Sequence, residues 1–253
     1  MKKLLVLAIV AAIAVSANAG LIGEEGVIDF DQVNISGNSG AWALGDEYQI
    51  IFVSTTKTNA MSNDIATYNN FVQGVADNAG LNANFKALVN TYKQTTSGGG
   101  TKMVDNIGGL VYGPRLIFVN GDSATPGGVG DGLNGLLKWS GKNAAIQVDE
   151  FGNVSSETRA WTGGGWDGDD WRALGNMTGD GTKDDTSVNG DGHRPWLGNL
   201  TLDGDAGWTN KDSANRDQLY SMVAVSEVLT VQTPEPATMA LLGLGGLFLR
   251  RRK

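Results

Sequence analysis

The chain has 253 residues, a formal net charge of −8 at pH 7, no cysteine and a single histidine, His193. An acidic surface repels phosphate backbones, which argues against nucleic acid as a partner. The absence of cysteine excludes disulfides, thiolate metal sites and cysteine nucleophiles, and one histidine leaves little scope for zinc sites or hydrolytic triads.

The N-terminus has the three regions of a secretory signal peptide. Lys2 and Lys3 precede an apolar stretch over residues 4–15, and an Ala-x-Ala site follows at Ala17 and Ala19. A charged region, an apolar region and a small-residue cleavage site in this order are typical of a leader that is removed on export. Residues 1–19 are therefore predicted to be a signal peptide.

Residues 20–233 are predicted to form one exported domain. Six basic residues and one acidic residue of the chain lie outside this range, so the remaining 214 residues carry a net charge of −13. A buried strand is expected over residues 48–54, which are rich in β-formers. A helix is expected from about 63 to 79, capped by Ser62 or Asn63 and ended by Gly80, because the following apolar residues share one helical face: Ile65, Tyr68, Val72, Val75 and Ala79.

The rest of the domain reads as short elements joined by irregular segments. Pattern and propensity predict the following in chain order: a helical turn at 85–88, a surface loop at 94–109, a strand at 115–119 ending in a turn at 120–122, a short helix near 133–137, strands at 144–148 and 159–162 around a turn at 151–153, and a β-forming segment at 219–231. The last segment is expected to pair with the strand at 48–54. This pattern predicts a single α+β domain.

Aspartate and tryptophan concentrate between residues 161 and 217, and calcium is the cation that such loops favour. Calcium takes six to eight oxygen ligands, and loops of Asp, Asn and Gly supply them. The best local pattern comprises Asp185, Ser187, Asn189 and Asp191. It is no EF-hand, since Trp196 occupies the position of the bidentate glutamate. The alternative is a solvated acidic loop whose side chains cap turns.

Two tryptophans in this region flank acidic side chains. Trp166 and Trp171 enclose Asp167 and Asp169. Exposed Trp beside carboxylates is suited to stacking on the apolar face of a sugar, so these four residues are candidates for glycan binding. The alternative is that the tryptophans pack into the core beneath long loops.

Catalysis has less support in the sequence. Paired loop aspartates could serve glycoside hydrolysis, which makes a secreted carbohydrate-active hydrolase the alternative function. No Gly-x-Ser-x-Gly elbow accompanies His193, and no phosphate-binding glycine loop is present. The domain is therefore predicted to be non-catalytic.

The middle of the chain resembles exported bacterial domains with a C-type-lectin-like fold. The resemblance is carried by residues 50–56, the helix that follows, and Ala160-Trp161-Thr162-Gly163 ahead of the Gly/Asp/Trp region. It implies paired first and last strands, an early helix against them, and a long loop region with Trp and calcium-binding carboxylates. The usual disulfides and the Glu-Pro-Asn or Gln-Pro-Asp sugar motif are missing, so it implies the fold more than sugar binding.

The C-terminal tail, residues 234–253, resembles the PEP-CTERM sorting tail of bacterial exported proteins. Pro234, Glu235 and Pro236 precede an apolar run of 13 residues and four terminal cations. A permanent membrane span needs about 20 apolar residues, so this run suits a temporary anchor whose cations stay in the cytoplasm. The resemblance implies recognition and processing by a membrane protease-transpeptidase of the exosortase type. An unprocessed C-terminal anchor is the alternative.

Together these patterns predict an exported protein of the cell surface or extracellular matrix of a Gram-negative-type bacterium. It is expected to be anchored briefly through its tail, to be non-enzymatic, and to bind calcium and polysaccharide.

Overall fold

The computed structural model describes residues 22–23, 28, 42–92, 100–109, 114–122, 124, 145–164, 173–175, 194–201 and 212–232. The predicted signal peptide with Ala17 and Ala19, the helix near 133–137, and the tail with Pro234, Glu235 and Pro236 lie outside these residues.

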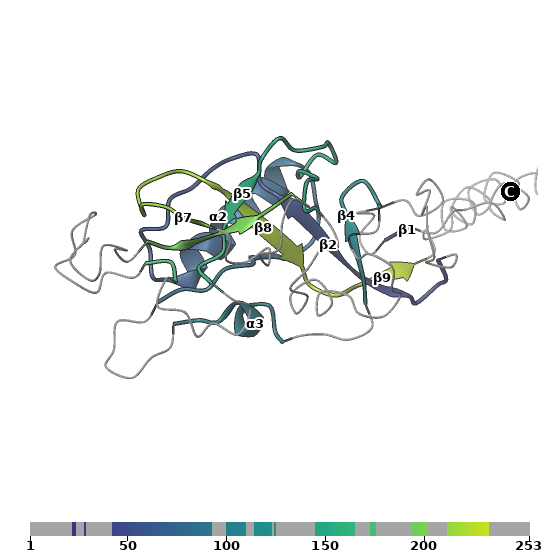
Figure 1. Cartoon of the computed structure of the whole chain (residues 1–253). Coiled ribbons are helices and arrows are strands. Elements are labelled where there is room, and N and C mark those ends of the chain that lie inside the picture. Colours follow the sequence, from purple (N-terminus) through teal and green to yellow (C-terminus); the bar gives the residue numbers. More distant parts are fainter. Residues whose placement is uncertain are drawn as a thin grey trace, which may run out of the picture.

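The described strands form one mixed sheet of nine strands. Its main path runs β1 (Ile22–Gly23), β9 (Leu229–Gln232), β2 (Glu47–Val53), β8 (Ser221–Ser226), β5 (Arg159–Trp161), β6 (Trp196–Asn199) and β7 (Asp212–Ser213). Two further strands branch from this path: β3 (Phe85–Ala87) pairs with β8, and β4 (Arg115–Phe118) pairs with β2. The β2–β4 and β5–β8 pairs are parallel and the others are antiparallel. β1, β4 and β9 lie at one end of the molecule and β5 and β7 at the other (Figure 1).

β2 and β8 are the centre of the sheet because both of their faces are covered. Successive side chains of a strand point to opposite faces. Ile50 and Phe52 accordingly join one apolar cluster, whereas Ile51 and Val53 join a second one. Every residue of β8 is buried. Burial on both faces explains why these strands read as continuous apolar runs rather than alternating ones.

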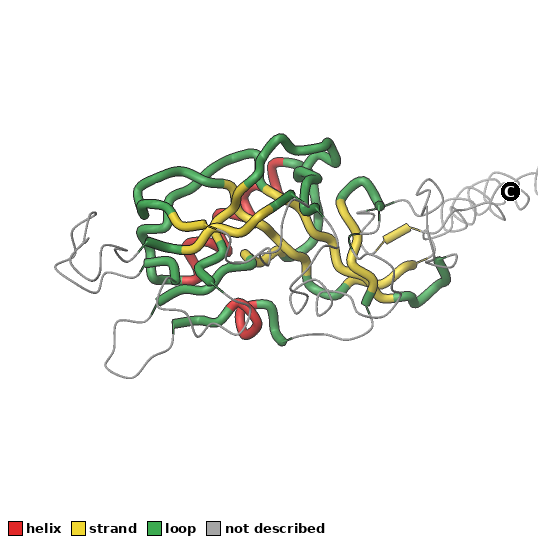
Figure 2. Tube along the Cα trace, in the orientation of Figure 1, coloured by secondary structure: helices red, strands yellow, loops and turns green. Residues whose placement is uncertain are grey.

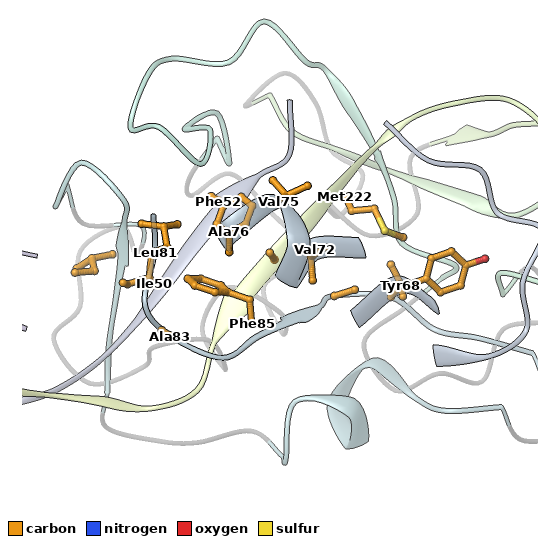
Figure 3. Close-up of a cluster of buried hydrophobic side chains, with 14 of the residues drawn as sticks. Ile50, Phe52, Tyr68, Val72, Val75, Ala76, Leu81, Ala83, Phe85 and Met222 are labelled. Atoms are coloured by element: carbon orange, nitrogen blue, oxygen red, sulfur yellow. The ribbon is translucent and has the colours of Figure 1, made fainter. Parts of the chain in front are cut away.

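The helix α2 (Ile65–Asn78) covers the first of these faces. Tyr68, Val72, Val75 and Ala76 are its buried residues, and they pack with β2, β3 and β8 (Figure 3). The predicted helix is confirmed, but its predicted cap at Ser62 or Asn63 is wrong. Asp64 is the N-cap, and its Oδ1 accepts the Ala66 amide at 3.0 Å. The Ser62 hydroxyl instead accepts the Asp64 amide at 3.1 Å, one step earlier.

The end of α2 at Gly80 is confirmed. Gly80 has a φ of +77°. Its amide donates to Asp77 O and the Leu81 amide donates to Ala76 O, both at 3.0 Å. These two bonds define a Schellman motif, in which the apolar residue after the glycine folds back over the helix end. Leu81 is buried in the first cluster.

The opposite face of the sheet is covered partly by the short helix α3 (Met103–Asn106), which lies below α2 in the view of Figure 2. The prediction of a surface loop over 94–109 is therefore wrong at 103–106, because Met103 is fully buried in the second cluster. The helical turn predicted at 85–88 is also wrong. Residues 85–87 are β3, with Phe85 and Ala87 buried on the α2 side and Lys86 exposed. Residues 224–226 of β8 pair with residues 85–87 and so favour a strand there.

The strands predicted at 115–119 and 159–162 are confirmed as β4 and β5. The strand predicted at 144–148 is wrong in its described part, where Val148 forms only an isolated bridge and 145–147 are irregular. β4 ends in a turn in which the Gly121 amide donates to Phe118 O at 2.8 Å. Val148 and Val154 pair across the turn predicted at 151–153. The closing segment pairs with β2, but as two strands, β8 and β9. The described part of the domain is mostly β, with few helices, and the C-type-lectin-like architecture remains a prediction.

Candidate functional site

The predicted ligands all lie outside the described residues, and the structure describes instead the points at which their loops leave the sheet and return. Within the described part of the chain, no group of three or more His, Asp or Glu side chains is placed to hold a metal ion. The residues without a described position are the calcium candidates Asp185, Ser187, Asn189 and Asp191 and the glycan candidates Trp166, Asp167, Asp169 and Trp171.

Segments 90–92, 162–164 and 173–175 form the base from which the tryptophan-bearing loop, residues 165–172, departs; we call them the loop platform. The Gly163 amide donates to Trp196 O at 3.1 Å, which fixes one end of the loop to β6. A Cβ built on Gly163 would lie 2.7 Å from Leu174 Cδ1 and 3.1 Å from the Leu174 amide nitrogen. The two described ends of segment 165–172 are therefore in contact.

Asn90 lies at the centre of the loop platform and is 1% exposed. Its amide donates to Thr162 O at 2.8 Å, and its carbonyl accepts from the Leu174 amide at 3.0 Å. Its side-chain Oδ1 accepts the Met103 amide at 2.6 Å, and its Nδ2 donates to Gly163 O at 3.3 Å. One buried residue thus holds both ends of the 165–172 loop and the start of α3.

Two more loops begin at the loop platform. The Thr91 amide donates to Thr101 O at 3.0 Å, which closes the base of segment 93–99. The Tyr92 amide donates to Leu174 O at 2.8 Å, which joins that base to the base of the 165–172 loop. Segment 176–193, which carries the calcium candidates, begins directly after Gly175. The bases of three loops are thereby brought together.

Gly175 is held against the chain that precedes α2. Its φ is +74°, and a Cβ built on it would lie 2.3 Å from both Ser62 O and the Asn63 amide nitrogen. No other residue fits this approach without moving backbone. The Gly175 amide also donates to Ala60 O at 2.9 Å. The start of the acidic segment is therefore fixed in position.

Tyr68 holds the segment before α2 that Gly175 contacts. Its hydroxyl donates to Ser62 O at 2.7 Å. Burial raises the pKa of the Tyr68 phenol well above its ordinary value, although the hydrogen bond to Ser62 acts weakly in the other direction. The phenol therefore stays protonated and keeps donating at any physiological pH.

A pair of asparagines connects β3 to both helices, and sequence analysis missed it. Asn69 Nδ2 donates to Asn106 Oδ1 at 2.8 Å, and Asn106 Nδ2 donates back to Asn69 Oδ1 at 2.9 Å. The same two side chains also accept the Ala87 amide and donate to the Ala87 carbonyl. They join α2, β3 and α3. The one sequence signal was an asparagine bordering the apolar face of a predicted helix.

The buried carboxylates of the described residues are already bound within the fold. Glu150 is 3% exposed and accepts hydrogen bonds from both the amide and the hydroxyl of Thr55. Asp149 Oδ1 accepts the Phe151 amide at 2.9 Å and the Asn153 amide at 2.8 Å, which builds the turn. Their geometry indicates structural roles.

The comparisons with known proteins identify the tail. Residues 232–253 match a family model described as the PEP-CTERM protein-sorting motif. The chain is thus an exported, exosortase-processed protein of a Gram-negative-type bacterium, anchored transiently in the membrane through its C-terminus. A search of curated proteins finds no significant match. In the part of the chain that the structure describes, no helix is both long and apolar enough to cross a membrane.

Proposed function

We propose that the exported domain is a non-catalytic component of the cell surface or extracellular matrix that binds calcium and polysaccharide through the loops of residues 165–191. One observation carries the proposal. Both ends of the 165–172 loop contact each other at Gly163 and Leu174, on a base that buried hydrogen bonds hold in place. A loop with fixed ends loses less conformational freedom when it binds a ligand.

The loop residues have the chemistry that this function needs. Trp166 and Trp171 offer aromatic faces for stacking on sugar rings, and Asp167 and Asp169 offer acceptors for sugar hydroxyls. The oxygen-rich segment 185–191 follows in the chain, and it begins from the fixed Gly175. The net negative charge of the exported domain raises the local concentration of divalent cations.

Calcium binding is tested by thermal unfolding of residues 20–233 in excess calcium and then in EDTA. A ligand that binds only the native state at 100 times its Kd stabilises it by about 2.7 kcal/mol, which is a shift of several degrees. The double variant Asp185→Asn, Asp191→Asn should lose the shift. Asp77→Asn, on the exposed surface of α2, is the matched control and should keep it. An equal Tm in calcium and EDTA would contradict calcium binding.

Polysaccharide binding is tested on a glycan array with calcium present. Trp166→Ala and Trp171→Ala should each lose binding, whereas Phe151→Ala, which removes an aromatic ring that is 59% exposed on another turn, should not. Release of sugar fragments by the native domain, abolished in Asp169→Asn, would show the alternative hydrolase function and refute the non-catalytic proposal.

A further inference from the structure

The sorting motif begins where the last strand of the domain ends. The matched region starts at Gln232, which is also the final residue of β9. Thr233 alone separates β9 from Pro234. No linker therefore stands between the packed domain and the residues that the processing enzyme recognises.

β9 is packed and hydrogen-bonded up to this boundary. Leu229 is 3% exposed and Val231 is 1% exposed. The Val231 amide donates to Asp46 O at 2.9 Å, and the Val231 carbonyl accepts from the Gly45 amide at 2.9 Å. On its other side β9 pairs with β1, with Gln232 opposite Ile22. The backbone groups next to the motif are thus already used within the domain.

An enzyme that cuts a chain has to enclose the residues beside the cut, and extended peptides are commonly bound through their own main-chain N–H and C=O groups. In the folded domain those groups of β9 pair with β1 and β2. We propose that exosortase acts on a state of this protein in which β9 is detached from the sheet, so that the packing of β9 controls the rate of processing. The proposal rests on the sorting motif and is independent of calcium or glycan binding.

Detachment of β9 is a limited opening. β9 pairs with β2 only at Glu47–Thr230 and Tyr48–Leu229, whereas β2 keeps its longer pairings with β8 and β4. Leu229 and Val231 are the buried side chains of β9 that opening would expose. Local openings of this size occur well below the free energy of global unfolding. The detached state is therefore reached while the rest of the sheet stays intact.

A reversible crosslink tests the proposal on the full chain in membranes that contain exosortase. Glu47 and Thr230 lie directly opposite each other, and the chain has no cysteine of its own, so E47C/T230C gives a single disulfide between β2 and β9. Mass spectrometry measures the rate at which the C-terminal tail is removed. This rate should be at least about tenfold lower in the oxidised variant, and reductant should restore it. R159C/N199C, which crosslinks β5 to β6, is the control and should be processed equally in both states.

Two further variants distinguish access from misfolding. Val231→Ala removes buried methyl groups from β9 and should speed processing on the order of tenfold. Insertion of about ten Gly and Ser residues after Gln232 places a flexible linker between β9 and the motif. The enzyme could then bind the motif without detachment of β9, so neither Val231→Ala nor the crosslink should change the processing rate. Equal processing rates for the oxidised and reduced E47C/T230C chains without the insertion would overturn the proposal.

Discussion

At the scale of single residues, Asn90 joins three segments through hydrogen bonds that an apolar side chain could not make. It presents a donor and an acceptor on its side chain and a donor and an acceptor on its backbone, and each has a partner on the loop platform or α3. Buried polar groups are stabilising only when they are satisfied in this way. This residue therefore sets where the 165–172 loop begins and ends.

Asn90→Ala should destabilise the domain by about 2–4 kcal/mol, because the Met103 amide and the Gly163 carbonyl would lose their partners in a buried position. Urea denaturation measures the change. Asn78→Ala, at the exposed end of α2, is the matched control and should change stability by less than about 0.5 kcal/mol. Similar effects of the two substitutions would show that Asn90 is not important for the platform.

Tyr68 predicts a pH dependence with a definite sign. The folded state holds the phenolic proton more tightly than the unfolded chain, in which the pKa is 10.0. The stabilisation by the bound proton is therefore complete below pH 10 and decreases as the pH rises above 10, by about 1 kcal/mol per pH unit. Denaturation of the native domain and of Tyr68→Phe at pH 8 and 11 should show a smaller decrease for the variant. Parallel decreases would refute the assignment.

At the scale of elements, local chemistry explains both ends of α2, yet it failed at β3. Gly80 and Leu81 act within a few residues of the helix, so the C-terminal end is readable in the chain. The N-cap is also local, but three neighbouring polar residues compete for it, and the structure selects Asp64. Segment 85–88 has apolar residues at a spacing that fits more than one structure. Its pairing with β8, more than 130 residues away, decides for a strand. Short segments are decided by distant partners when their own propensities are ambiguous.

Substitution by alanine should change the free energy of unfolding in opposite directions at two glycines, one inside α2 and one just after it. Gly80→Ala should cost about 1–2 kcal/mol, since φ is +77° although the space around it is open. Gly74→Ala, inside the helix and also without a neighbour within 4 Å, should gain about 0.5–1 kcal/mol. Thermal unfolding of both variants against the native domain checks this. The same sign for both would contradict the described end of α2.

At the scale of the whole molecule, the sheet is completed from the far end of the chain. β8 lies between β2 and β5 and also pairs with β3, and its residues are all buried. A chain that lacks residues 221–226 has no β8 and therefore lacks the centre of its sheet. The finished sheet therefore depends on residues near the C-terminal end of the domain.

Truncation tests this dependence. A chain ending at residue 220 should show no cooperative unfolding and no near-UV circular dichroism, because β2, β3 and β5 lose their common partner. A chain ending at residue 233 should retain the full transition, since β9 is then complete. A cooperative transition in the shorter chain would show that β8 is dispensable.

The export route and the local elements are specified by short stretches of the chain. Capping, propensity and apolar patterns act between residues close together in the chain. They are enough to specify the sorting tail, the helix α2 with its end at Gly80, and the buried strands at 48–54 and 219–231. Three features arise from tertiary contacts instead: the strand at 85–87, the burial of Met103, and the convergence of loop bases around Asn90. These depend on contacts between segments far apart in the chain, for which a single sequence carries no pairing information.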